Sequence, residues 1–145
     1  MAIYSGALNT TSIGSGTPAL DWRAGAANSP KVLESGVILG AATASIFTLG
    51  RSANTPAQSG PVNLLAEDVA NPFPIGQTTG AMAWTTTPTI PTNICRRASL
   101  VGAIGTAMIW TFPRGYAIAA AGPTLVLWNG AANASPTGAW IVVDE

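Results

Sequence analysis

Apolar and polar residues alternate over short stretches in the last third of the chain, and this alternation predicts β-strands. In TAMIWTFP, residues 106–113, Met108, Trp110 and Phe112 fall on one face of an extended strand, and Ile109 falls on the other. Because both faces carry bulky side chains, we expect this strand to be covered on both sides or to lie at a surface between subunits.

Two more stretches near the end of the chain follow the same pattern. They are PTLVLWNG, residues 123–130, which ends at an Asn-Gly turn, and AWIVVDE, residues 139–145. Strands that succeed one another every ~8–15 residues, with turn residues between them, are typical of a β-sandwich or a barrel rather than of alternating strands and helices.

The pattern continues upstream, where Gly and Pro separate further strand-like stretches. We expect strands in SPKVLESGVILG (29–40) and TASIFTLGRSA (43–53), a short strand or one helical turn in PVNLLAEDV (61–69), and a strand leading into a proline-broken loop in GAMAWTTTPTIP (80–91). No long window keeps a helical apolar stripe free of Gly and Pro. The sequence therefore predicts an all-β fold, a β-sandwich or barrel over residues 31–145.

The first 30 residues differ from the rest, because Ser, Thr, Gly, Ala and Asn surround isolated apolar residues. Such a segment lacks the apolar density for a core of its own. It is either a flexible terminus or an extended arm, residues 1–30, that is ordered on a neighbouring molecule. We favour the arm, docked through Tyr4, Leu20 or Trp22, because a disordered tail has little use for Trp.

The longest uncharged stretches are too short or too broken to cross a membrane. Only 15 residues separate Arg97 from Pro113, whereas a spanning helix needs about 20. The run from Gly115 to Val143 is interrupted by turn signals. The N-terminal residues show neither the basic nor the apolar region of a signal peptide, which predicts synthesis in the cytoplasm without one.

Charge is scarce and balanced in this chain of 145 residues. Six basic and six acidic residues give a net charge of zero, and only 8% of residues are charged. A soluble monomer usually has ~25–35% charged residues on its surface and a net charge away from zero. We therefore expect one domain whose surface is partly covered by copies of itself or by another protein. The single cysteine, Cys95, is expected to be a small buried apolar residue.

The sequence holds no convincing catalytic or metal site. The absence of histidine removes the usual base for a Ser or Cys nucleophile, and one cysteine cannot supply a zinc site. A Ser–Lys pair would need Lys31, and a pair of catalytic carboxylates would have to include Glu34; both are disfavoured interpretations. Arg96, Arg97 and Arg114 are too few for the basic stripe that binds nucleic acid directly. We expect no enzyme activity and no cofactor.

Four arginines lie where predicted strands begin or end. Arginine is well suited to bidentate pairing with carboxylates across interfaces. The candidate partners are Glu34, Glu67, Asp68, Asp144 and Glu145, within or between subunits, with solvated loop arginines as the alternative. The residues that we predict to lie at interfaces are Tyr4, Leu20, Trp22, Glu34, Arg51, Arg96, Arg97 and Arg114.

From Ser29 to Glu145 the order of segments resembles small virion proteins of tailed phages. ATASIFTLGR and the ending IAAAGPTLVLWNGAA…WIVVDE are the most suggestive parts. The resemblance is to β jelly rolls, notably capsid decoration (cement) proteins, and it implies a jelly-roll-like β-sandwich over residues 31–145. It implies a homotrimer without enzyme activity that sits on the outer surface of the phage capsid and contacts the major capsid protein.

Two other classes of protein remain as alternatives to a decoration protein. A receptor- or glycan-binding module of a phage tail fibre or spike would expose aromatic rings for stacking on sugars, with Trp84, Trp110 or Tyr116 as candidates. In a decoration protein the same rings should be buried. A small enzyme is the third class and has the least support.

Overall fold

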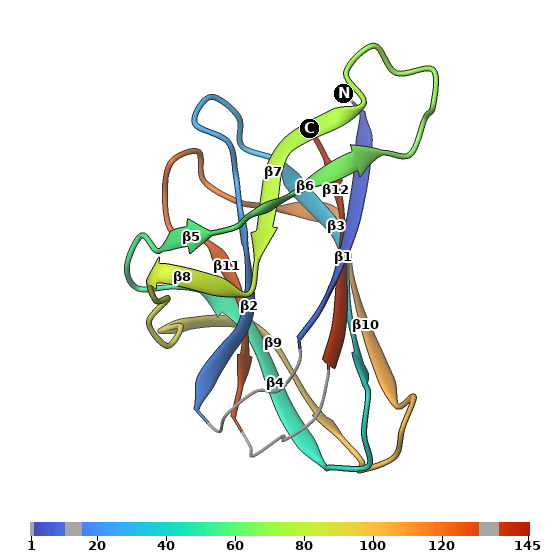
Figure 1. Cartoon of the computed structure of the whole chain (residues 1–145), viewed down its shortest axis with the longest axis vertical. Helices are drawn as coiled ribbons and strands as arrows, with labels where there is room; N and C mark the ends of the chain where they lie inside the picture. Colours follow the sequence, from blue (N-terminus) through green and yellow to red (C-terminus); the bar gives the residue numbers. More distant parts are fainter. Residues whose placement is uncertain (1, 11–15, 131–136) are drawn as a thin grey trace.

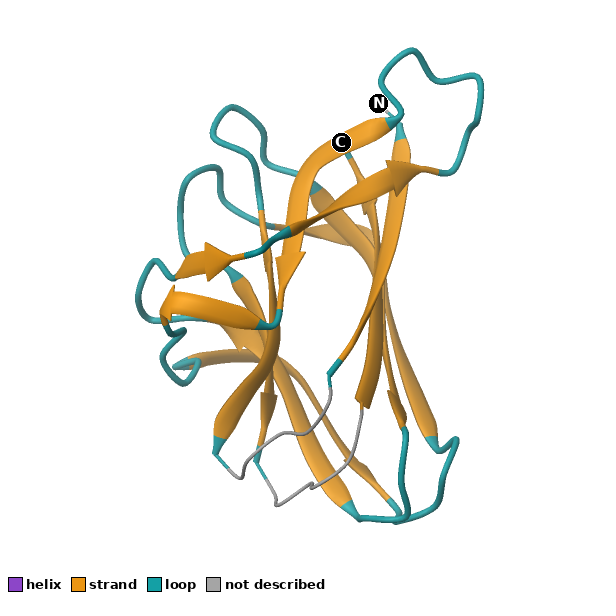
Figure 2. Cartoon of the chain, viewed as in Figure 1, coloured by secondary structure: helices purple, strands orange, loops and turns teal. Residues whose placement is uncertain are grey.

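The computed structural model describes residues 2–10, 16–130 and 137–145, and every regular element in these ranges is a β-strand (Figure 2). The all-β prediction is therefore confirmed. The strands are β1 (Ile3–Asn9), β2 (Thr17–Arg23), β3 (Lys31–Leu39), β4 (Ser45–Arg51), β5 (Ala57–Ser59), β6 (Val62–Ala66), β7 (Ile75–Ala81), β8 (Ala83–Thr86), β9 (Asn93–Leu100), β10 (Ala107–Ala117), β11 (Leu125–Asn129) and β12 (Thr137–Asp144).

Ten of these strands form one antiparallel sheet that folds over into a sandwich. Its order is β10-β3-β12-β1-β6-β7-β2-β11-β4-β9. Strands β10, β3, β12 and β1 make one layer and β2, β11, β4 and β9 the other, with β6 and β7 crossing between them at one end (Figure 1). Without β5–β8, the eight remaining strands have the connectivity of a jelly roll, the fold that the resemblance implied.

The core lies between the two layers. In β12 every second residue is buried, so that Ile141 and Val143 face inward as the alternation indicates. All five residues of β11 are buried, which confirms a strand covered on both faces. In β10, Trp110 and Phe112 face the core but Ile109 is 53% exposed, so this chain covers only one face of that strand. Burial of Ile109 between subunits stays a prediction.

The first 30 residues are part of the sandwich and not an extended arm. Strand β1 pairs with β12 and β6, and β2 pairs with β11 and β7, while residues 11–15 lie outside the described part of the chain. Tyr4, Leu20 and Trp22 belong to the hydrophobic core, with Leu20 and Trp22 at 0% and 1% exposure. The apolar residues here are sparse, but they alternate, and strands distant in the sequence supply the rest of the core.

The segment between β4 and β9 closes one side of the sandwich. Strands β6 and β7 bridge β1 and β2, whereas β5 and β8 form a separate two-stranded sheet. PVNLLAEDV therefore contains a strand rather than a helical turn. The β5–β8 sheet contacts the outer side of β2, where Gln58 and Trp84 both donate hydrogen bonds to Asp21.

The opposite side of the sandwich stays open. Strands β9 and β10 are the two ends of the strand order, and they contact each other without forming a ladder. Arg96 and Arg97 lie within β9 rather than before a strand, and Arg114 lies within β10. Among the described residues there is no helix that is long and apolar enough to span a membrane.

Candidate functional site

The open side between β9 and β10 presents two free strand edges. Such edges invite further strands unless charge, proline or a bulge disrupts them. Strand β10 has all three features, since its register shifts between Thr111 and Tyr116 where Pro113 and Arg114 lie. Gly115 completes the irregularity with a φ of 71°, a conformation that favours glycine. These features disfavour the pairing of a further β-strand with the free edge of β10.

Arginines and aromatic rings line this open side in an alternating stack. The Arg51 guanidinium lies 4.9 Å from the centre of the Tyr116 ring, and the Arg96 guanidinium 4.7 Å from that of Phe112. The two rings are 5.7 Å apart. Each cation–ring contact stabilises the arrangement by about 0.5–1 kcal/mol at an exposed site.

A shallow groove of about 360 Å³ lies at this place, lined by Arg96, Phe112, Pro113, Arg114 and Gly115. We call the surface formed by Arg51, Arg96 and Arg114 with Phe112, Pro113 and Tyr116 the arginine seam. These three arginines are exposed, whereas Arg97 lies on the outer face of β9 because it alternates with the buried Ala98. The seam combines an apolar floor with cationic walls, which suits a ligand that is both acidic and apolar.

Two of the carboxylates predicted to pair with these arginines accept hydrogen bonds from other groups. Glu34 accepts a hydrogen bond of 2.8 Å from Trp140 Nε1, and the Glu145 side chain accepts two from the backbone N–H groups of Gln77 and Thr78. Arg51 instead donates to the Ala117 carbonyl. No arginine–carboxylate ion pair forms among the described residues of one chain, so pairing within the subunit is wrong and pairing between subunits stays a prediction.

Cys95 lies beside the seam and is only partly buried. Its thiol donates to the Leu49 carbonyl at 3.1 Å. Burial raises the pKa of Cys95, and the nearby Arg96 opposes this only in part. Because the thiolate is the reactive form of cysteine, a raised pKa argues against a nucleophilic role.

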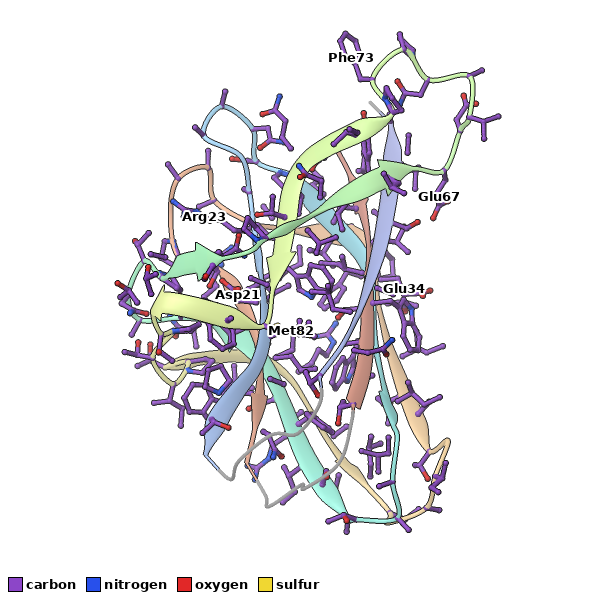
Figure 3. All side chains as sticks on the ribbon, viewed as in Figure 1. Asp21, Arg23, Glu34, Glu67, Phe73 and Met82 are labelled. Carbon is purple, nitrogen blue, oxygen red and sulfur yellow. The ribbon has the colours of Figure 1, made fainter. Side chains whose placement is uncertain are left out.

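A second surface lies on the loop between β6 and β7, residues 67–74, which projects beyond the sandwich near both chain ends (Figure 1). We call it the acidic loop because it begins with Glu67 and Asp68, both exposed. Val69 and Phe73 are 100% and 72% exposed, and the Phe73 ring stands clear of the ribbon (Figure 3). An open cleft of about 720 Å³ separates the loop from Ala2, Ile3, Tyr4 and Glu145.

Hydrogen bonds hold the acidic loop in place. The Tyr4 hydroxyl donates to the Phe73 carbonyl at 2.9 Å and accepts from Asn71 Nδ2 at 3.3 Å. Asp68 Oδ1 accepts from the Ala70 N–H. The loop carboxylates do not converge, and no group of three potential metal ligands occurs in the described ranges.

Asp21 is the one fully buried carboxyl among the described residues. Its Oδ1 accepts from Trp84 Nε1 at 2.7 Å and from Gln58 Nε2 at 3.0 Å. Burial raises the pKa of Asp21, and the hydrogen bonds from Trp84 and Gln58 and the charge of Arg23 oppose this only in part. The group links the β5–β8 sheet to β2, and it has no second carboxyl beside it that would make an acid–base pair.

The predicted interface residues therefore divide into two sets. Tyr4, Leu20 and Trp22 are buried in their own chain, so they are not free to dock on a neighbour. Arg51, Arg96 and Arg114 gather in the seam, whereas Arg97 lies on the outer face of β9 and Glu34 accepts a hydrogen bond from Trp140. No pattern in the sequence indicated that Phe112 and Tyr116 would stack with these arginines, because a bulge decides which side chains of β10 face the seam.

The rings proposed for stacking on sugars are not free either. Trp110 is 7% exposed, Trp84 is half-buried and hydrogen-bonded to Asp21, and Tyr116 lies under Arg51. Comparison with protein-family models, with curated proteins and with solved structures finds no match for this chain. The arginine seam, the acidic loop and the exposed apolar residues are therefore the features that bear on its function.

Proposed function

We propose that this protein is a non-enzymatic structural component of a virus particle. Specifically, it is a capsid decoration protein that binds the outside of a mature tailed-phage head as a trimer and stabilises it. One observation carries the proposal: a jelly roll of net charge zero exposes twelve large apolar side chains among its described residues, at 38–100% exposure. Extended apolar surface on a soluble protein is typical of a surface that binds another protein.

These exposed residues are not scattered evenly. On the outer face of β10, β3 and β12, Ile109 and Trp140 are both register partners of Gly36, and Ile38 follows two residues further along β3. Ile38 and Ile109 are 38% and 53% exposed. We call this group the outer-face strip and assign it to the contact with the major capsid protein.

A second apolar group extends along the β6–β7 hairpin. Leu65 and Ile75 are register partners with 61% and 60% exposure, and they continue into Val69 and Phe73 on the acidic loop. Two separate apolar surfaces suit a protein that must contact both a scaffold and its own copies. We assign this second surface to contacts between copies.

Stabilisation follows from selective binding. A protein that binds the assembled shell and not separated capsomers makes rupture harder by its binding free energy, about 2.7 kcal/mol per site at a free concentration 100 times the Kd. This action needs a rigid body and a good interface but no reactive group. The absence of histidine from the sequence agrees with such a role.

The test is binding to mature, DNA-free heads of the virus that encodes the chain, prepared without this protein. We expect saturable co-sedimentation and a higher temperature of head disruption. Ile109→Glu should weaken co-sedimentation at least tenfold, whereas Val101→Glu should not, although Val101 in the β9–β10 loop is also apolar and is more exposed, at 71% against 53%. Failure to bind heads together with binding to glycans would overturn the proposal in favour of a tail-fibre module.

A further inference from the structure

We infer that copies of this chain associate head to tail, with the acidic loop of one copy seated in the arginine seam of the next. The inference rests on the proposed function only in assuming that the protein assembles with itself. It identifies the two surfaces that meet and the side chains that pair.

Charge is the first argument. Of six basic residues, Arg51, Arg96 and Arg114 lie in the seam, and of six acidic residues, Glu67 and Asp68 lie on the acidic loop. The net charge of zero therefore includes a basic surface and an acidic surface at different places on the molecule. Because the seam arginines have no carboxylate partner within the described part of their own chain, they remain available to one from another copy.

The apolar parts of the two surfaces match as well. The seam groove has Phe112 and Pro113 in its lining, between Arg96 and Arg114. The acidic loop presents the exposed ring of Phe73 and the fully exposed side chain of Val69 beside its carboxylates. An aromatic anchor in an apolar groove, bordered by ion pairs, is the usual make-up of a binding hot spot.

The strand order dictates that such a contact joins different copies. Strands β6 and β7 are fifth and sixth of the ten in the folded-over sheet, while β9 and β10 are its two ends. Strands β3, β12 and β1 lie between the acidic loop and the seam, although register pairs from Ala117 through Lys31 and Asp144 to Ile3 place both surfaces toward the same end of the sandwich. Because three strands separate them, a chain cannot place its own loop in its own seam. A contact between two different surfaces is heterologous, and repeating it gives a closed ring or an open chain of copies.

The loop is also held ready for binding. Tyr4 fixes the backbone at Phe73 from the core side, and Asp68 and Asn71 close short turns onto Ala70 and Phe73. A loop that is already ordered loses less conformational entropy when it docks. This gives buried Tyr4 a positioning role in assembly that differs from the direct contact expected from the sequence.

The test exchanges charges between the two surfaces of the full chain. A seam variant carries Arg96→Glu and Arg114→Glu, and a loop variant carries Glu67→Arg and Asp68→Asn, where Asn retains the oxygen that accepts from Ala70. Arg23→Glu is the matched control, because Arg23 is a basic residue outside the seam. Sedimentation velocity gives the mass of each, and circular dichroism and urea unfolding show that each is folded.

We expect the seam variant and the loop variant each to dissociate at least tenfold more readily than the wild type and the control. An equimolar mixture of the two should associate again, because each supplies the intact surface that the other lacks. A chain with both sets of changes should also associate with itself through the reversed charges. Folded variants that associate like the wild type, absence of rescue, or a wild type that is monomeric at about 1 mM would overturn the inference.

Binding to heads separates this inference from the proposed function. If the wild type binds heads as an oligomer that no charge exchange disturbs, the head-to-tail contact is wrong and the decoration role stands. If the exchanged charges control association but no variant and no wild-type protein binds heads, the contact is right and the decoration role is wrong.

Discussion

At the scale of single residues, Asp21 is the most unusual group in the described part of the chain. It is fully buried, and the hydrogen bonds from Trp84 and Gln58 support its charged form only in part. Its Oδ2 has no hydrogen-bond partner. Burial of a carboxylate is unfavourable unless it is paired, so Asp21 makes the stability of the fold depend on pH.

Replacing Asp21 with Asn should change that dependence in a defined direction. The pKa of Asp21 is raised above its ordinary value of 3.8, so the folded protein binds this proton more tightly than the unfolded chain does. Its contribution to the free energy of unfolding is therefore greatest below about pH 4 and falls as the pH rises through the raised pKa. We expect Asp21→Asn to become more stable relative to the wild type between pH 3.5 and 7 in urea unfolding. Parallel pH profiles would contradict this.

A glycine in β7 tests the packing of the core. A Cβ at Gly80 would overlap the Trp22 indole and a Leu8 methyl group, both on strands of the N-terminal segment. Gly80→Ala should therefore destabilise the protein by about 1–3 kcal/mol in urea unfolding. Gly130→Ala, where a Cβ meets only ordinary contacts with Ile46, should stay within about 0.5 kcal/mol of the wild type. Equal effects at both sites would show that Trp22 is not packed as described.

At the scale of elements, the N-terminal strands decide whether the sandwich can form. Strand β1 pairs with β12 through seven register partners from Ile3↔Asp144 to Asn9↔Gly138, and β2 lies between β7 and β11. Removing these strands would leave new free edges and an opened core.

Deletion of residues 1–23 should therefore abolish cooperative folding. The loss of Tyr4, Leu8, Leu20 and Trp22 removes four large core side chains, and truncation of even one such residue costs about 2–5 kcal/mol. Near-ultraviolet circular dichroism and NMR chemical-shift dispersion measure the outcome. If the truncated chain retains a cooperative transition and dispersed signals, the interpretation of the first 30 residues as an extended arm would be supported instead.

At the scale of the whole molecule, the arrangement of charge matters more than its amount. The sequence pI is about 6.1, so no net repulsion separates copies near that pH. Opposite charges on the seam and on the acidic loop should then attract copies to one another. Association through apolar contacts alone would not depend on these two charged surfaces.

Salt should distinguish these two contributions. The Debye length falls from about 30 Å at 0.01 M to about 8 Å at 0.15 M salt. Association that depends on the charges of the seam and the acidic loop should therefore weaken as sodium chloride is added. We expect the mass from light scattering at pH 6 to decrease between 0.01 and 0.5 M salt. Purely apolar association does not weaken in this way, and an increase in mass over this range would contradict the role of the charged surfaces.

The sequence by itself determined the strand character of the chain and its all-β class. Alternation in β3, β4, β11 and β12 is a local property, because successive side chains of any extended backbone point to opposite faces. The position of Arg51 at the end of a strand was also predicted correctly. Such features depend on residues within a few positions of one another.

Only the tertiary structure decided where the first 30 residues go, what the arginines contact and which side of the sandwich stays open. Each depends on contacts between segments far apart in the chain, such as Tyr4 with Phe73, Arg51 with Tyr116 and Glu34 with Trp140. Sparse apolar residues look insufficient when they are counted locally, yet they complete a core once distant strands surround them. Pairing between distant strands is set by the packing of the whole core, and no local pattern of side chains encodes it.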